Sequence, residues 1–141
     1  MTTEGEAARI YRRYNVAENT RDRVAMGALL DPALTVEMNG SAAIGSADED
    51  DAAMDALFRA YPDYRREIVA VVDGGPEAAV RWRMRGTPRP ELADRLPVID
   101  IRGCSFVRVR DGRMAAAWLY ADADAMGGLL SLAATLAPPD A

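Results

Sequence analysis

The sequence predicts an α+β fold, in which helices pack on one mostly antiparallel sheet. Apolar residues recur at helical spacing in the first half of the chain, and they alternate with polar residues in the second half. Turn residues join the later strands directly, which is typical of antiparallel neighbours. The chain of 141 residues shows no repeat or linker, so we expect one domain over 1–141, with 137–141 as a frayed tail.

Helices are predicted over 3–19, 22–30 and 46–61. The first begins with a capping box of Thr3 and Glu6, and the third with one of Ser46 and Glu49. Asp22 supplies the cap of the second, which ends before a proline because the residue preceding proline avoids helical geometry. A short helix or tail is expected over 126–136.

Strands are predicted over 33–38, 66–72, 77–85, 98–110 and 113–122. The pair Asp111-Gly112 is a strong hairpin signal between the last two. Alternation assigns the following residues to inward faces: Leu34, Val36 and Met38; Val80, Trp82 and Met84; Ile99, Ile101, Ser105, Val107 and Val109; Trp118, Tyr120 and Asp122. The last strand therefore predicts a carboxylate on the same face as two aromatic rings.

Composition excludes several functions. The formal charge of −5 argues against a nucleic-acid partner, and no apolar run reaches the length of a membrane span. The start of the chain lacks the pattern of a secretion signal and there is one cysteine, so a cytoplasmic protein is expected. All 17 basic residues are arginine. The absence of histidine and lysine excludes an imidazole base and a Schiff base, and we expect neither a metal nor another cofactor.

Three segments carry a family resemblance: 56–64, 80–87, and 108–114 followed by Trp118 and Asp122. In order and spacing they resemble the SnoaL-like polyketide cyclases of the nuclear transport factor 2-like superfamily. The resemblance implies a cone-shaped α+β barrel around an apolar pocket, a homodimer, and cofactor-independent cyclisation or isomerisation of a polyketide-like hydrophobic intermediate.

The resemblance also implies site residues. The general base of the cyclases falls on Asp122, without the family's usual histidine partner. The first helix is similar to that of the ketosteroid isomerases, whose oxyanion-binding tyrosine falls on Tyr14. The isomerase base and second acid fall on Met38 and Ser105, so steroid isomerisation is not expected.

Each of these residues also has a structural interpretation. Apolar neighbours would raise the pKa of Asp122 toward that of a working base, yet Asp122 could instead cap a following helix. Tyr14 could bind an oxyanion or simply fill the core. The same choice between substrate contact and core packing applies to the expected substrate-binding residues Met38, Met54, Phe58, Trp82, Met84, Ser105, Trp118 and Tyr120.

Three other functions remain open from the sequence. The pocket could promote a pericyclic ring closure by shape alone, without an essential base. The protein could bind a hydrophobic small molecule without changing it. Asp100 and Arg102 resemble part of an epoxide-hydrolase site, but alternation places them on the face opposite Ile101, where an exposed or interfacial pair is the alternative.

Overall fold

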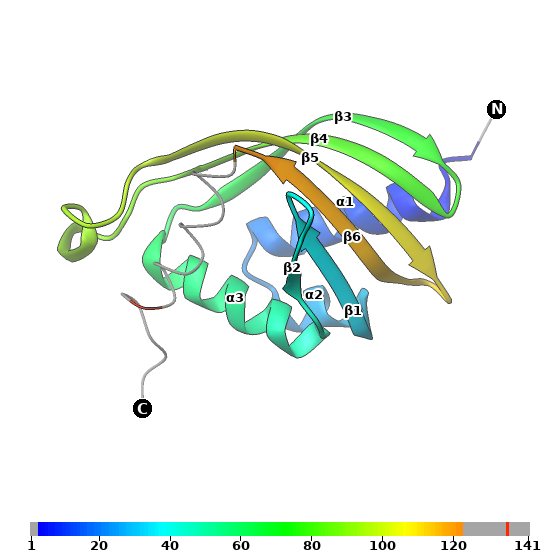
Figure 1. The fold of residues 1–141 in the computed structure, drawn as a ribbon, viewed down its shortest axis with the longest axis horizontal. Helices are drawn as coiled ribbons and strands as arrows, with labels where there is room; N and C mark the ends of the chain where they lie inside the picture. Colours follow the sequence, from blue (N-terminus) through cyan, green and yellow to red (C-terminus); the bar gives the residue numbers. More distant parts are fainter. Residues whose placement is uncertain (1–2, 123–134, 136–141) are drawn as a thin grey trace.

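The computed structural model describes residues 3–122 and 135, and it shows three helices packed against one curved, six-stranded sheet that does not close (Figure 1). The helices lie on the concave side of the sheet. This arrangement confirms the predicted α+β class. The segment predicted as a helix or tail over 126–136 lies outside the described residues except for residue 135, and the tail over 137–141 lies wholly outside them.

The helices are α1 (Glu6–Asn19), α2 (Arg23–Ala28) and α3 (Ala47–Ala60). Two of the predicted caps are confirmed, because Asp22 accepts from the Ala25 amide at 3.0 Å and Ser46 accepts from an amide in the first turn of α3. The cap predicted for α1 is wrong. Its N-cap is Gly5, whose amide donates to the Asp73 carboxylate at 2.7 Å, so a side chain from a distant strand replaces the local box.

The strands are β1 (Leu30–Met38), β2 (Ser41–Ile44), β3 (Arg65–Gly74), β4 (Glu77–Gly86), β5 (Ile99–Arg110) and β6 (Arg113–Ala121). Their order in the sheet is β2-β1-β6-β5-β4-β3. Only the β1–β6 pair is parallel among these neighbours. Sequence analysis missed β2, a short and largely exposed strand that returns from the turn at Asn39 and Gly40, where both residues have positive φ. A 3-10 turn, Pro90–Leu92, lies between β4 and β5.

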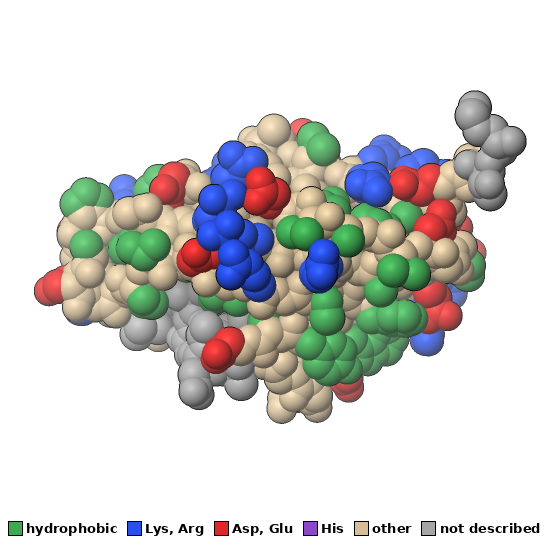
Figure 2. All heavy atoms as spheres, turned by 90° about the horizontal axis from the view of Figure 1, so that it is seen from above, with side chains coloured by type: hydrophobic (Ala, Val, Ile, Leu, Met, Phe, Trp, Pro, Cys, Tyr) green, Lys and Arg blue, Asp and Glu red, His purple; other side chains and the backbone are tan. Residues whose placement is uncertain are grey.

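Strands β4 and β5 have the predicted inward faces. Val80, Trp82 and Met84 are buried on β4, as is the face of β5 that carries Ser105 and Val107. The opposite, convex face carries a band of arginine side chains with acidic side chains beside them and apolar patches to either side (Figure 2). Two ion pairs of that face join Arg83 to Asp100 and Arg85 to Glu67.

The predicted face of β6 is wrong. Met114 is buried and pairs with Val109, whereas Ala116 pairs with Arg108, so Ala115 is an extra residue in the ladder. A bulge of one residue moves every later side chain to the opposite face. As a result Ala117 is buried while Tyr120 is 49% exposed, and Asp122 beyond the strand is exposed as well.

Candidate functional site

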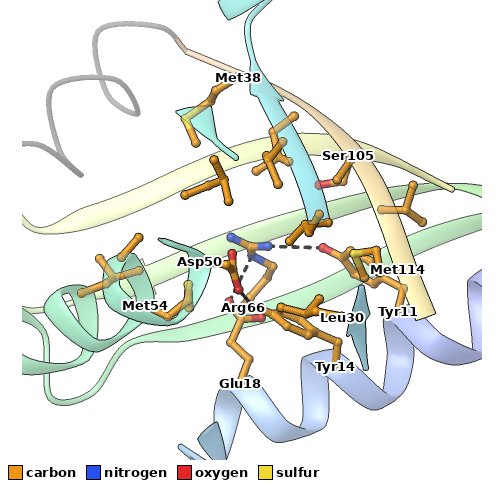
Figure 3. Close-up of a pocket in the computed structure, with 18 of the residues that line it drawn as sticks. Tyr11, Tyr14, Glu18, Leu30, Met38, Asp50, Met54, Arg66, Ser105 and Met114 are labelled. Atoms are coloured by element: carbon orange, nitrogen blue, oxygen red, sulfur yellow. Dashed lines mark hydrogen bonds and ion pairs between the residues drawn. The ribbon is translucent and has the colours of Figure 1, made fainter. Parts of the chain in front are cut away.

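A cavity of about 80 Å³ lies between the concave face of the sheet and helices α1 and α3 (Figure 3). Its apolar lining consists of Leu30, Leu34, Val36, Met38, Ile44, Ala53, Met54, Leu57, Met84, Val107, Met114, Ala117 and Leu119. Its polar lining consists of Tyr11, Tyr14, Glu18, Asp50, Arg66 and Ser105. A mostly apolar cavity with a few polar groups is the usual form of a small-molecule site.

A carboxylate and a tyrosine hydroxyl meet at the cavity. Tyr14 of α1 donates to Oδ2 of Asp50 on α3 at 2.7 Å. Burial raises the pKa of Asp50 above the usual aspartate value, even though the hydrogen bond from Tyr14 lowers it. Burial, and then the negative charge of Asp50, raise the pKa of Tyr14 well above its usual value. This arrangement offers a proton acceptor of increased basicity beside a hydroxyl that keeps its proton.

Arg66 of β3 brings a buried positive charge to the same cavity. Its backbone is fixed by Asn19, which accepts from the Arg66 amide at 2.9 Å and donates to its carbonyl at 2.8 Å. Its guanidinium lies 4.7 Å from the centroid of the Trp82 ring and forms an ion pair with Glu18 at 3.8 Å. Burial acts to lower the pKa of Arg66, but the negative charge of Glu18 and the neighbouring tyrosines raise it well above its usual value. The guanidinium is therefore charged throughout the ordinary pH range.

Ser105 has a structural partner as well as a place in the cavity lining. Its hydroxyl oxygen accepts from Nε1 of Trp82 at 2.8 Å, and both side chains are buried. The pair lies on neighbouring strands β4 and β5. A buried indole N–H requires such a partner, so Ser105 holds the aromatic floor beneath Arg66 in place.

The SnoaL-like domain family matches residues 11–131 of the sequence, which is most of the chain. The chain belongs to the SnoaL-like family. A search of curated proteins finds no match to this SnoaL-like protein. Structural comparison adds relatives of low sequence identity, which share the fold.

Three solved structures illustrate this similarity. A protein from Jannaschia sp. CCS1 assigned as a SnoaL-like polyketide cyclase has a TM-score of 0.72 at 18% identity, covering 99% of this chain and 97% of its own. A protein from Sinorhizobium meliloti assigned as a polyketide cyclase has a TM-score of 0.64 at 22% identity, covering 78% and 92%. A protein from Kribbella flavida assigned as a ketosteroid isomerase has a TM-score of 0.65 at 19% identity, covering 83% and 78%.

The cavity brings together half of the residues that the sequence analysis expected at the site. Those that line it are Tyr14, Met38, Met54, Met84 and Ser105. The other five expected residues do not line it; they are Phe58, Trp82, Trp118, Tyr120 and Asp122. Trp82 is fully buried behind the cavity wall, and Phe58 lies under the guanidinium of Arg21, 4.4 Å from the ring centroid. Whether the cavity residues contact a substrate stays a prediction.

The bulge explains why Trp118, Tyr120 and Asp122 lie elsewhere. Trp118 packs against Phe106 on the convex face, with the ring centroids 5.8 Å apart. Asp122 is exposed just beyond the end of β6. The carboxylate and the two aromatic rings that were expected to share the cavity therefore lie outside it. The location of Asp122 gives no support to a role as general base.

The epoxide-hydrolase fragment also lies outside the cavity. Asp100 and Arg102 are exposed on the convex face of β5, as their alternation predicts. Asp100 accepts from Arg83 at 2.7 and 2.8 Å, and this pairing lowers the pKa of Asp100. These contacts account for Asp100 as a surface ion-pair residue.

Sequence reasoning missed four polar residues of the cavity, namely Tyr11, Glu18, Asp50 and Arg66. A signal existed for two of the charged ones. Glu18 follows Tyr14 by four residues on the buried stripe of α1, and Asp50 precedes Met54 by four on the buried stripe of α3. A charge on an apolar helical stripe is a candidate site residue.

Within residues 3–122 and 135, no cluster of histidine, cysteine, aspartate or glutamate is arranged to hold a metal ion. No helix there is both long and apolar enough to cross a membrane.

Proposed function

We propose that this SnoaL-like protein is a cofactor-independent cyclase or isomerase of a small, mostly apolar, polyketide-like carbonyl compound. Membership of the family supports this reaction class. The single observation that carries the proposal is the 2.7 Å hydrogen bond between Tyr14 and Asp50 at a mostly apolar cavity. We propose Asp50, rather than Asp122, as the general base.

The proposed reaction begins with removal of a proton next to a carbonyl group. The carboxylate of Asp50 takes the proton, and the electron pair of the C–H bond moves into the carbonyl to form an enolate. A protonated Asp50 is a poorer acceptor, so the hydroxyl of Tyr14 becomes available to the enolate oxygen. In a cyclisation the enolate carbon attacks a second carbonyl to close a ring, and the alkoxide formed from that carbonyl recovers the proton from Asp50. In an isomerisation a different carbon recovers the proton from Asp50.

The buried charge of Arg66 supports the same step. A fixed positive charge in a site of low polarity stabilises developing negative charge without reorganisation. Arg66 lines the cavity together with Asp50 and Tyr14, so an enolate formed there would lie within its field. The cavity is smaller than the ~150 Å³ cavity that holds benzene. We therefore expect only the reacting ring or chain segment to be enclosed, with movement of the flexible methionines that line it.

Deuterium exchange tests this proposal without knowledge of the natural substrate. Small cyclic ketones are incubated with the protein in heavy water, and loss of the proton signal next to the carbonyl is followed by NMR. We expect the wild-type protein to accelerate the exchange and Asp50→Asn to abolish the acceleration. Asp51→Asn is the matched control, because Asp51 is the next residue of α3 and pairs with Arg23 outside the cavity.

The other outcomes separate the rival functions. Loss of exchange in Asp122→Asn but not in Asp50→Asn would restore the assignment made from sequence. Binding of ketones without any exchange would contradict acid–base catalysis and favour a carrier. If Asp50→Asn still converts a substrate into its cyclic product, ring closure by shape alone is favoured.

We also propose that the convex sheet face forms a homodimer. Phe106 is 39% and Tyr120 is 49% exposed on this face, and Trp118 packs against Phe106. Exposed aromatic clusters are typical of interfaces, and the arginine band of the convex face offers positive charges to acidic side chains of a second copy (Figure 2). Sedimentation of the wild type should give a dimer and Phe106→Arg a monomer, whereas a monomeric wild type would refute the proposal.

A further inference from the structure

Two buried polar atoms at the cavity have no hydrogen-bond partner among the described residues. They are Oε1 of Glu18 and Nε of Arg66. The Glu18 side chain is 1% exposed and the Arg66 side chain is 10% exposed, and both residues line the cavity. Leaving such groups unpaired is costly, so each needs an account.

The neighbouring contacts fix the orientation of these atoms. The other oxygen of Glu18, Oε2, accepts from the hydroxyl of Tyr64 at 2.8 Å. Nη1 of Arg66 donates to the hydroxyl of Tyr11 at 3.4 Å, and Nη2 contacts the sulfur of Met84. Nε of Arg66 lies 3.8 Å from Oε2 of Glu18, which is too long for a hydrogen bond. The two side chains therefore attract each other but form no hydrogen bond. Nε of Arg66 is left as an unpaired donor and Oε1 of Glu18 as an unpaired acceptor.

We infer that Glu18 and Arg66 form a subsite for a hydroxyl group of the ligand. A hydroxyl oxygen accepts from Nε of Arg66 while its proton is donated to Oε1 of Glu18. An anionic group would meet the charges of Glu18 and Asp50, and a cationic group would meet Arg66. A neutral group that donates and accepts at once matches both atoms.

This inference rests on the proposed function, since it takes the cavity as the substrate site. It narrows the substrate class to small hydroxylated carbonyl compounds. The carbonyl lies beside Asp50 and Tyr14, and the hydroxyl lies beside the adjacent Glu18 and Arg66. The apolar ring or chain occupies the methionine-rich wall formed by residues such as Met38 and Met54 (Figure 3).

Two isomeric probes, cyclobutanol and tetrahydrofuran, test the subsite. They contain the same atoms and are small, but the alcohol donates and accepts whereas the ether only accepts. Binding is followed by NMR on protein labelled at the methionine methyl groups, because Met38, Met54, Met84 and Met114 line the cavity and locate the bound probe. We expect cyclobutanol to bind about tenfold more tightly, since the ether leaves the Glu18 carboxylate oxygen unpaired.

Glu18→Gln gives a sharper result. Tyr64 donates to one carboxylate oxygen, so the amide oxygen takes that position and the amide NH₂ group replaces Oε1. The subsite then presents two donors, and we expect the preference to reverse in favour of tetrahydrofuran. Glu67→Gln is the matched control, because Glu67 pairs with Arg85 on the convex face and its exchange should leave the preference unchanged.

Equal binding of the two probes to the wild type would overturn the inference, as would binding that leaves the cavity methionines unperturbed. So would the failure of both probes to bind at the highest concentration at which the protein stays folded. The wild-type comparison stands even if Glu18→Gln does not fold. The subsite is tested by binding and the proposed function by deuterium exchange of ketones. A negative result in one experiment can therefore be told apart from a negative result in the other.

Discussion

Removing the charge of Arg66 should destabilise the protein far more than removing an exposed arginine. Arg66 is 8% exposed, pairs with the fully buried Glu18 and stacks on Trp82 at 4.7 Å. Arg66→Met keeps much of the apolar volume but leaves a buried carboxylate without its cation. Breaking a buried pair in this way costs about 3–5 kcal/mol, a large part of the total stability of a domain.

The second substitution separates the stranded charge from the lost packing. Gln at position 18 still accepts from Tyr64, so Glu18→Gln combined with Arg66→Met should cost less than Arg66→Met alone. What remains is chiefly the lost stacking on Trp82, about 1–2 kcal/mol. Arg85→Met is the control, because Arg85 and Glu67 are both 44% exposed and such a pair contributes less than about 1 kcal/mol.

Urea unfolding at neutral pH, followed by circular dichroism, measures these free energies of unfolding. If Arg66→Met costs no more than Arg85→Met, the carboxylate of Glu18 does not depend on its cation. If the double variant costs as much as the sum of its two single variants, the carboxylate left unpaired by Arg66→Met contributes nothing to the loss of stability.

Three further substitutions test the site. Asp50→Asn should gain stability relative to wild type as pH rises from about 4, because the raised pKa of Asp50 makes its ionisation unfavourable in the folded state; a pH-independent difference in urea unfolding would contradict this. Ser105→Ala should cost about 1–3 kcal/mol in the same assay by leaving Nε1 of Trp82 unpaired, and a cost near zero would argue against that bond. Gly103→Ala should cost about 1–3 kcal/mol, since its Cβ would lie 2.6 Å from the Trp82 ring and 2.7 Å from the Tyr120 carbonyl oxygen; an unchanged melting temperature would show that the strands move apart freely.

Regular alternation explains why most of the sheet could be predicted. On β4 the large residues Val80, Trp82 and Met84 alternate with arginines, so only one phase buries apolar area. The segment from Met114 to Ala117 of β6 holds three consecutive alanines, which fit either face almost equally well. Nothing local marks the extra residue at Ala115, and the two aromatic residues that follow suggested the wrong phase.

The polar cavity was harder to predict because its members come from four separate elements. Tyr14 was found through a family resemblance, whereas Glu18 and Asp50 could have been found as charges on apolar helical stripes. Arg66 had no such signal, since it is the second residue of β3, a strand with no clear alternation of buried and exposed residues. Its role becomes visible only when β3 lies against α1, where Asn15 and Asn19 both donate to its carbonyl oxygen.

The polar groups of the cavity are a poor choice if stability alone is considered. A buried ion pair is often no more stable than well-packed apolar residues of similar volume, and here Glu18 and Arg66 leave two atoms unsatisfied. The Asp50 carboxyl adds a further cost, because burial disfavours its charged form. A curved sheet with helices on its concave face could be filled with aliphatic side chains throughout. The groups that cost stability are concentrated at one end of one cavity, where a ligand would recover the cost, and this concentration is why we assign function to that end rather than to the exposed carboxylate of Asp122.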